Sequence, residues 1–301
     1  LSPGQLAPIL PLCTTAAFRI ELRPLPGVRM AAPISLIDVI NRFIAADTIT
    51  LPVFNNAAVR LQMELVKPEP DLRVIEQVIT SDQALSSQVL KIANSAFYRG
   101  LIEVGTVRAA IIRLGMREIG RIVLMAASRQ HFRSSDRIIG VVMKKLWQHS
   151  VGCAYGTAWL ARRRDYGVEQ SQAFFGGLFH DVGKLFVLMV IEQIKRKNKA
   201  LKLTDTLLTE AMNRLHAREG SRLLTQWNMP EHLHVIARDH HAVEIDGQNR
   251  LLLLVRMANL VCRKLGIGLA EDGSLLLAAT PEANLLGLTG TALAELEGAL
   301  E

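Results

Sequence analysis

From Ser35 onward, apolar residues recur every three or four positions, which is the spacing of one face of an α-helix. The first such segment follows Ser35, a residue type that caps helices, and has apolar residues at positions 36, 37, 40, 43 and 44. No sustained alternation of apolar and polar residues follows, and the sequence looks extended only at 48–53. The pattern therefore predicts an all-α fold.

Capping residues and glycines indicate where the other helices begin and end. Asp71, Ser81, Thr106 and Ser135 are each placed to cap a following helix, and Gly115 is placed to end the helix that Thr106 begins. The predicted helices are 36–46, 72–79, 82–95, 106–115, 116–131, 135–164, 169–191, 204–227, 230–241 and 249–265.

Proline and histidine are unevenly distributed along the chain. Six prolines fall within 1–34, so this stretch is predicted to be a poorly structured lead-in, and it has no basic start typical of a signal peptide. All eight histidines lie within 131–241, seven of them after His131, and this shift in composition suggests a boundary between two lobes near Ser134. We expect a lead-in at 1–34, a first helical lobe at 35–133, a second lobe at 134–265, and a C-terminal extension with a short helix at 266–301.

Composition excludes several classes of protein. Apolar residues make up 50% of the 301 residues, which is too many for a disordered chain. The three cysteines have no C-x-x-C spacing, so neither a disulfide framework nor a thiolate zinc site is expected, and a reducing, cytoplasmic location fits best. The longest apolar run, 185–191, is far shorter than the roughly 20 residues that cross a bilayer, so no membrane segment is expected.

The charge balance raises the question of a nucleic-acid partner. The chain has 35 basic and 28 acidic residues, a net charge of +7 and a pI near 9.6. Its basic clusters, at 162–164 and 195–202, follow apolar helical runs, where cations favourably face the negative end of the helix dipole. Because aromatic residues are not interleaved and no reader motif is present, a nucleic-acid surface is not favoured.

Imidazoles and one carboxylate form an ordered series in the second half of the chain. Helices that each project one or two such groups inward can build a metal site inside a bundle. Nearby Gly176, Gly177 and Gly183 would let neighbouring backbones approach, and Lys184 follows on the same helical face, where it could contact a bound phosphate. By contrast, His131, His232 and His234 are interpreted as surface or packing residues. The series itself consists of His149, His180, Asp181, His216, His240 and His241.

With these motifs in place, residues 50–265 resemble the HDOD domain, a bacterial signalling module related to the HD metal-dependent phosphohydrolases. The first half resembles it through Leu51-Pro52 and through the segments 78–98 and 107–115. The second half resembles it through Trp147-x-His149-Ser150, the Gly177–Lys184 segment, His216-x-x-Glu219-Gly220 and Trp227-Asn228-Met229-Pro230. The resemblance implies a two-lobed helical fold with an HD-type bundle as its second lobe.

The resemblance to the related HD-GYP phosphodiesterases also implies a ligand set for one or two divalent ions, with iron, manganese or nickel as the candidates. His149, His180 and Asp181 would hold the first ion, and Asn259 occupies the position where a terminal aspartate is expected. Asp181 would bridge to a second, more intact site with His216, His240 and His241.

Three departures from that pattern affect the expected activity. Asn259 can ligate through its amide oxygen but supplies no negative charge, which weakens hydrolysis before it weakens binding. Lys145 stands where an acidic residue is expected, and the segment 242–247 replaces the GYP signature.

Three functions remain open. The favoured one is a signalling module with a protein partner, which binds metal or a phosphate-bearing ligand such as a nucleotide at a degenerate site with little or no catalysis. The second is an active metal-dependent phosphohydrolase acting on nucleotides or cyclic dinucleotides. The third, a helical nucleic-acid-binding protein, is the least favoured.

Overall fold

The computed structural model describes residues 35–46, 60–61, 64–65, 67, 69–95, 102–129, 131–163 and 166–301. Within these ranges the chain is helical and contains no strand, which confirms the predicted all-α class. The predicted lead-in and the extended stretch at 48–53 lie outside the described residues.

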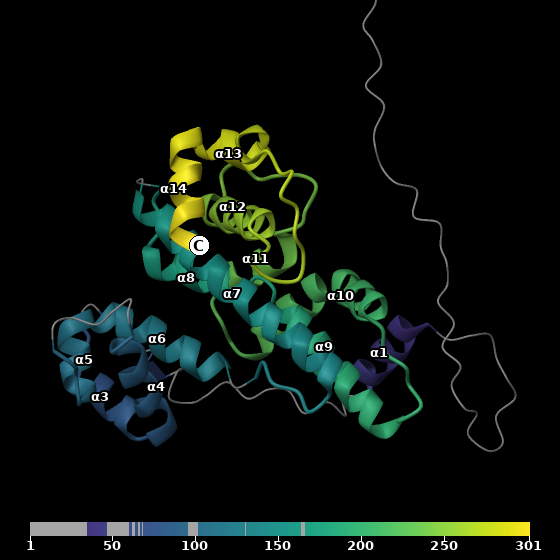
Figure 1. The fold of residues 1–301 in the computed structure, drawn as a ribbon, viewed down its shortest axis with the longest axis horizontal. Helices are drawn as coiled ribbons and strands as arrows, with labels where there is room; N and C mark the ends of the chain where they lie inside the picture. Colours follow the sequence, from purple (N-terminus) through teal and green to yellow (C-terminus); the bar gives the residue numbers. More distant parts are fainter. Residues whose placement is uncertain are drawn as a thin grey trace, which may run out of the picture.

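Four helices form a compact group at one end of the molecule (Figure 1). They are α3 (Leu72–Thr80), α4 (Gln83–Ala93), α5 (Val107–Leu114) and α6 (Met116–Arg129). The residue that caps α4 is Asp82, one position after the predicted Ser81, because the Asp82 carboxylate accepts from the Leu85 amide. The Asn94 side chain both donates to and accepts from the Val104 backbone, at 2.9 Å each, and so ties the end of α4 to the loop before α5.

The larger part of the molecule is built on a long helix, α7 (Arg137–Arg163), which packs against α8 (Gln170–Phe179) and α12 (Arg250–Lys264). The helices α9 (Val182–Lys197), α10 (Asp205–Gln226) and α11 (Glu231–Asp239) complete this bundle.

The start of α7 differs from the prediction. Asp136 accepts from the Ile138 and Ile139 amides, so it caps the helix in place of Ser135. The Ser135 hydroxyl instead lies 3.1 Å from the Glu192 carboxylate and joins the start of α7 to α9.

The predicted continuous helix at 169–191 is wrong, because the chain breaks it into α8 and α9 at His180 and Asp181. His180 ends α8, and Asp181 precedes the first residue of α9. The apolar period continues across the break, so sequence alone gave no sign of it. The break matters for function because it turns both side chains toward the centre of the bundle.

Both ends of the described chain pack on this bundle. Helix α1 (Leu36–Ala45) lies against α9 and α10, although the sequence grouped it with the first lobe; its buried Leu36, Ile40 and Ile44 explain the contact. At the other end, α13 (Pro281–Leu286) and α14 (Gly290–Leu300) lie beside α12 and share a second hydrophobic core with it (Figure 1). The C-terminal extension thus holds more than the single short helix expected.

One segment, 170–197, is long and apolar enough to cross a membrane by composition alone. It comprises the broken pair α8 and α9, and 83% of its apolar window is buried inside the protein. That degree of internal burial is typical of core helices.

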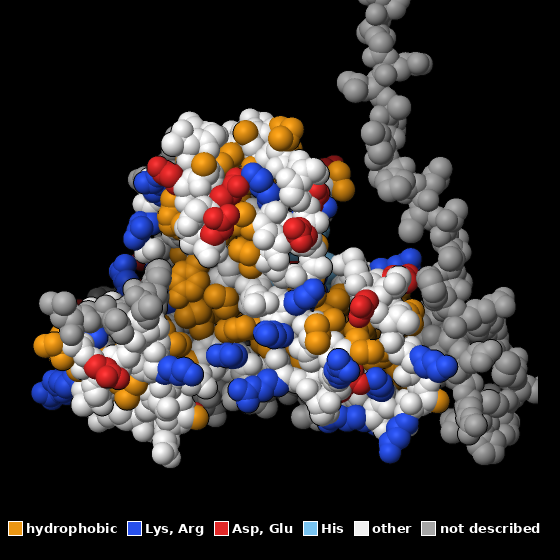
Figure 2. All heavy atoms as spheres, in the orientation of Figure 1, with side chains coloured by type: hydrophobic (Ala, Val, Ile, Leu, Met, Phe, Trp, Pro, Cys, Tyr) orange, Lys and Arg blue, Asp and Glu red, His pale blue; other side chains and the backbone are white. Residues whose placement is uncertain are grey.

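Basic side chains are spread over both parts of the face shown in Figure 2, and hydrophobic side chains gather between α6 and α8. At the end of α9, Lys195 pairs with Asp136, Arg196 pairs with Glu192, and Lys197 lies 4.6 Å from the centre of the Phe43 ring. These contacts agree with the interpretation of this basic cluster as the end of a helix.

Candidate metal centre

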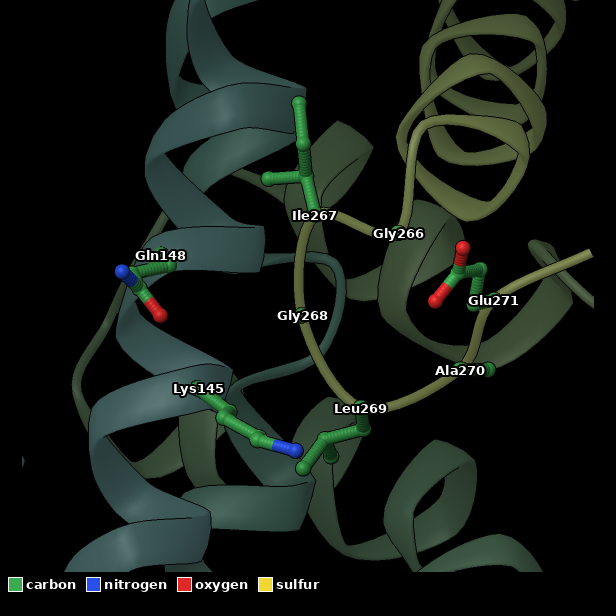
Figure 3. A pocket seen from close by; sticks show the side chains of 8 residues that line it. All are labelled: Lys145, Gln148, Gly266, Ile267, Gly268, Leu269, Ala270 and Glu271. Atoms are coloured by element: carbon green, nitrogen blue, oxygen red, sulfur yellow. The ribbon is translucent and has the colours of Figure 1, made fainter. Parts of the chain in front are cut away.

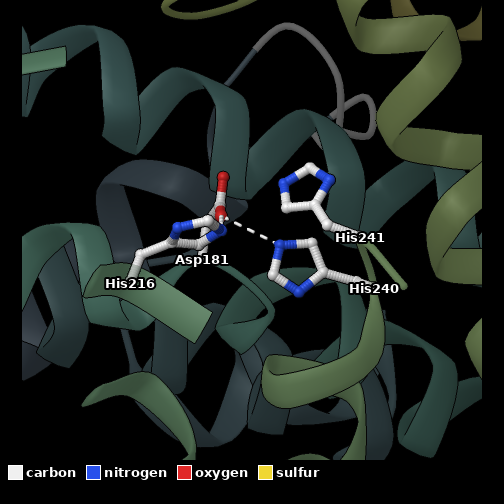
Figure 4. Close-up of side chains that lie close together, drawn as sticks. All are labelled: Asp181, His216, His240 and His241. Carbon is white, nitrogen blue, oxygen red and sulfur yellow. Dashed lines mark ion pairs between the residues drawn. The ribbon is translucent and has the colours of Figure 1, made fainter. Parts of the chain in front are cut away.

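Six of the seven predicted ligands meet where four segments of the bundle converge. His149 projects from the middle of α7, the His180–Asp181 pair from the break between α8 and α9, and His216 from α10. His240 and His241 follow the last residue of α11. In Figure 4 the rings of His216, His240 and His241 surround the Asp181 carboxylate.

Two glycines allow these helices to approach. A Cβ on Gly183 would lie 1.9 Å from the His216 carbonyl oxygen, and a Cβ on Gly177 would lie 2.4 Å from the Cys153 carbonyl oxygen. No side chain fits at such distances, so α9 meets α10 and α8 meets α7 only because these residues are glycine. The role expected of the two glycines is therefore confirmed.

Asp181 lies at the centre and divides the cluster into a first half, with His149 and His180 on its Oδ2 side, and an Oδ1 half, with His216, His240 and His241. Its Oδ1 is 3.3 Å from His240 Nε2 and 3.7 Å from His216 Nε2. Its Oδ2 is 3.4 Å from His180 Nε2 and 3.5 Å from His149 Nε2. The ligand atoms within each half, with His241 in the Oδ1 half, lie within 4.8 Å of one another. Each oxygen of the Asp181 carboxylate thus faces one half of the cluster.

Backbone hydrogen bonds fix the orientation of four of the imidazoles. In each ring Nδ1 faces a carbonyl oxygen and donates to it, so in the neutral ring Nε2 carries an unprotonated lone pair. A histidine held in this way is typical of a metal ligand. The accepting carbonyls are Ile267 for His149 (3.0 Å), Gly177 for His180 (2.7 Å), Met212 for His216 (2.8 Å) and Ile236 for His240 (3.0 Å).

These lone pairs point at a carboxylate, which also only accepts hydrogen bonds. Asp181 Oδ1, His216 Nε2 and His240 Nε2 are accordingly buried without a hydrogen-bond partner. Unsatisfied buried polar atoms are destabilising, and acceptors facing one another add repulsion. A cation among them would relieve both, so the donor set fits a divalent ion.

The ionisation states also suit a metal. Burial lowers the pKa of His149 and of His216 to about 4, and burial together with the adjacent His240 lowers the pKa of His241 to about 3. These rings are therefore neutral near pH 7. Burial alone would raise the pKa of Asp181, but the adjacent Lys184 ammonium holds it well below the usual value.

Lys184, the predicted phosphate contact, lies beside the cluster. Its ammonium is 2.7 Å from Asp181 Oδ2, and its side chain is largely buried. The ammonium therefore offsets the negative charge of Asp181 at Oδ2, the oxygen that faces His149 and His180.

Asn259 is half-buried on α12. Among the described residues, no hydrogen bond or ion pair joins it to the cluster. On the following turn of α12, Cys262 does approach the cluster, together with Cys153 on α7.

The cysteines were not predicted as site residues, since their spacing follows no metal-binding motif. Both are fully buried, and Cys153 Sγ lies 3.6 Å from His149 Nε2. Burial raises the pKa of the Cys153 thiol well above its ordinary value. The available signal was the position of Cys153, one helical turn after His149 on the same face.

A cavity of about 430 Å³ lies between α7 and the loop 266–271 (Figure 3). Lys145 and Gln148 of α7 line one side, and the loop 266–271 lines the other. Gly268 of this loop contacts His149 closely, since a Cβ there would lie 2.6 Å from the His149 Cβ. The loop therefore packs directly against His149, whose Nδ1 also donates to the Ile267 carbonyl.

Solved structures with the same fold are known. An HDOD domain protein of unknown function from Geobacter sulfurreducens is 19% identical, with a TM-score of 0.67 over 88% of this chain and 96% of that one. A Shewanella amazonensis protein, provisionally described as a metal-dependent phosphohydrolase, is 19% identical, with a TM-score of 0.62 over 88% of this chain and 98% of that one.

Sequence comparison identifies the family. An uncharacterized protein of Treponema pallidum is 23% identical over 223 residues, which are 71% of this chain and 42% of the relative, so the chain spans less than half of that protein. The HDOD domain matches residues 51–243, well over half of the chain. The chain therefore belongs to the HDOD family.

Proposed function

We propose that this chain is a regulatory HDOD module that binds one or two divalent transition-metal ions at the Asp181 cluster, with little or no catalytic turnover. The observation that carries the proposal is the set of inward-facing acceptors: four imidazole Nε2 atoms fixed by backbone hydrogen bonds around one buried carboxylate. Iron, manganese and nickel suit a set of imidazoles with a single carboxylate.

A phosphate-bearing ligand, such as a nucleotide, is the second part of the proposal. When bound, the metal would supply positive charge for phosphate oxygens, and the Lys184 ammonium lies beside the same carboxylate. His241 is the exposed member of the cluster, so the half that contains it is the side a ligand can reach. A change in this ligand or in the metal would then be passed to a protein partner.

Closure of the first half argues against efficient turnover. His180 and Asp181 are each only 1% exposed, and the loop 266–271 covers His149. A substrate would have to reach an ion there past this loop. The neutral Asn259 and the basic Lys145 also leave that half with less negative charge than the phosphodiesterases it resembles.

The alternative is an active metal-dependent phosphohydrolase. The observation in its favour is the complete set of four ligands in the Oδ1 half, which has an exposed edge at His241. We rank this alternative second because hydrolysis depends on the negative charge that both halves supply to the metal ions, and the first half supplies less of it.

The test is metal analysis of the full chain purified without chelators, followed by titration with Mn²⁺, Fe²⁺ or Ni²⁺. We expect one or two ions per chain, and loss of binding in Asp181→Asn and His240→Ala. His232→Ala is the matched control, because this half-buried histidine lies on α11, the helix that ends just before His240, and is outside the cluster. A wild type that binds none of the three metals would refute the proposal. Turnover of cyclic dinucleotides at about 1 s⁻¹ or more would favour the phosphohydrolase instead.

A further inference from the structure

A second group of possible ligands adjoins the Asp181 cluster and differs from it chemically. It consists of His149 and Cys153 on α7 and Cys262 on α12, whose ligand atoms lie within 4.8 Å of one another. All three residues are buried, and neither cysteine is in a disulfide.

Packing between α7 and α12 leaves room for the Cys262 thiol. A Cβ on Gly152 would lie 3.0 Å from Cys262 Sγ and 3.1 Å from the Ile267 side chain. Glycine at this position therefore lets Cys262 lie against α7, next to the turn that carries Cys153. The two thiols, far apart in sequence, meet at one wall of the His149 ring.

The His149 ring can serve either group but not both at once. Its Nδ1 donates to the Ile267 carbonyl, so Nε2 holds the single available lone pair. That atom lies 3.5 Å from Asp181 Oδ2 and 3.6 Å from Cys153 Sγ. If His149 Nε2 coordinated an ion bound by the two cysteines, it could not at the same time coordinate an ion bound by Asp181.

We propose that His149, Cys153 and Cys262 form a binding site for a soft or borderline divalent cation, with Zn²⁺ as the best match. One imidazole and two thiolates are a ligand set that zinc accepts, with a fourth position left open. The thiol protons pass to solvent as the ion binds. Thiolates select such ions, whereas the Asp181 cluster presents imidazole and carboxylate only. The site is independent of the proposed function except for the shared His149.

Co²⁺ in place of Zn²⁺ gives a direct test, because cobalt bound to thiolate has a charge-transfer absorption in the near ultraviolet that nitrogen and oxygen ligands do not produce. The full chain is titrated with Co²⁺ under reducing, oxygen-free conditions. We expect the band in the wild type and its loss in Cys153→Ser and Cys262→Ser. Cys13→Ser, which changes a thiol outside the described residues, is the matched control and keeps the band.

A further variant separates this site from the Asp181 cluster. His241→Ala removes a ligand of the cluster only, so the thiolate band persists even if metal binding at the cluster fails. A band that survives in the double variant Cys153→Ser/Cys262→Ser would overturn the proposal, as would a wild type without any band.

A measurement on the wild type alone covers the case in which the serine variants do not fold. X-ray absorption at the zinc edge, with one equivalent of Zn²⁺, is expected to show sulfur at about 2.3 Å from the metal. A first shell of nitrogen and oxygen alone would show that the cysteines are packing residues.

Discussion

The Nε2 atoms of His149 and His180 lie 3.3 Å apart, and the Nδ1 atom of each ring faces a backbone carbonyl. Both Nε2 atoms are therefore acceptors, and neither ring can donate a proton to the other while both are neutral. Two facing lone pairs, beside the Asp181 carboxylate, make the metal-free site a source of instability.

Divalent metal should stabilise the wild type against heat. An ion that binds only the folded chain at 100 times its Kd adds about 2.7 kcal/mol, which corresponds to a rise in Tm of several degrees. The measurement is a thermal melt with and without Mn²⁺, Fe²⁺ or Ni²⁺, repeated after chelation. Asp181→Asn should lose most of the response, and His232→Ala should keep it. Equal responses in all three proteins would place the bound metal elsewhere.

Gly183→Ala should destabilise the fold because its Cβ would meet the His216 carbonyl oxygen at 1.9 Å. Backbone atoms cannot yield as a flexible side chain can, so we expect a loss of about 3 kcal/mol or more in the free energy of unfolding, measured in urea. Gly298→Ala, at a helical site with nothing within 4 Å, is the control and should be neutral or slightly stabilising. A tolerated alanine at 183 would mean that α9 and α10 are less tightly packed than described.

The metal-free protein should lose stability as the pH falls from about 6.5 to 4. Burial lowers the pKa of His149 and of His216 to about 4 in the folded state, whereas both are near 6.5 when unfolded. In this window the unfolded chain binds more protons, so the free energy of unfolding rises with pH. Urea melts across the window test this, with chelator present. His216→Gln should flatten the dependence, and an unchanged slope in that variant would contradict the assignment.

Lys184→Met should destabilise the metal-free chain and should be rescued by metal. The ammonium, 2.7 Å from Asp181 Oδ2, is the nearest positive charge to a carboxylate that is 1% exposed. Removing one partner of a buried pair typically costs about 3–5 kcal/mol. A divalent ion would compensate the same carboxylate, so the difference from wild type should shrink with metal. Lys144→Met, on the exposed face of α7, controls for the loss of a charge. If metal leaves the loss of stability in Lys184→Met unchanged, Lys184 acts through packing and not through its charge.

The sequence predicted the helical class and the ligand series because both depend on local patterns. Helical spacing shows in the apolar residues, and imidazole and carboxylate groups are recognisable by type. The break at His180 could not be predicted, since the apolar period runs through it and the turn depends on contacts with α7 and α10. The meeting of Cys153 with Cys262 depends on how α7 packs against α12, which no spacing in the chain records.

Asn259 occupies the position where the resemblance leads us to expect a carboxylate. Asn259→Asp is nearly isosteric, and the side chain is half-buried on α12, so packing should tolerate it. If it faces the first half, the new charge should destabilise the metal-free chain by repulsion with Asp181. Bound metal should reverse that loss, giving the variant a larger metal-induced rise in Tm than the wild type.

Asn284→Asp is the matched control for this change, since it adds the same charge at an exposed position of α13. Its response to Mn²⁺, Fe²⁺ or Ni²⁺ should equal that of the wild type. An Asn259→Asp variant that responds no more than this control would show that position 259 faces away from the ions. If it responds more strongly, the neutral amide accounts for a first half that binds metal weakly, and assays of cyclic dinucleotide hydrolysis in the variant would then show whether that single charge separates binding from turnover.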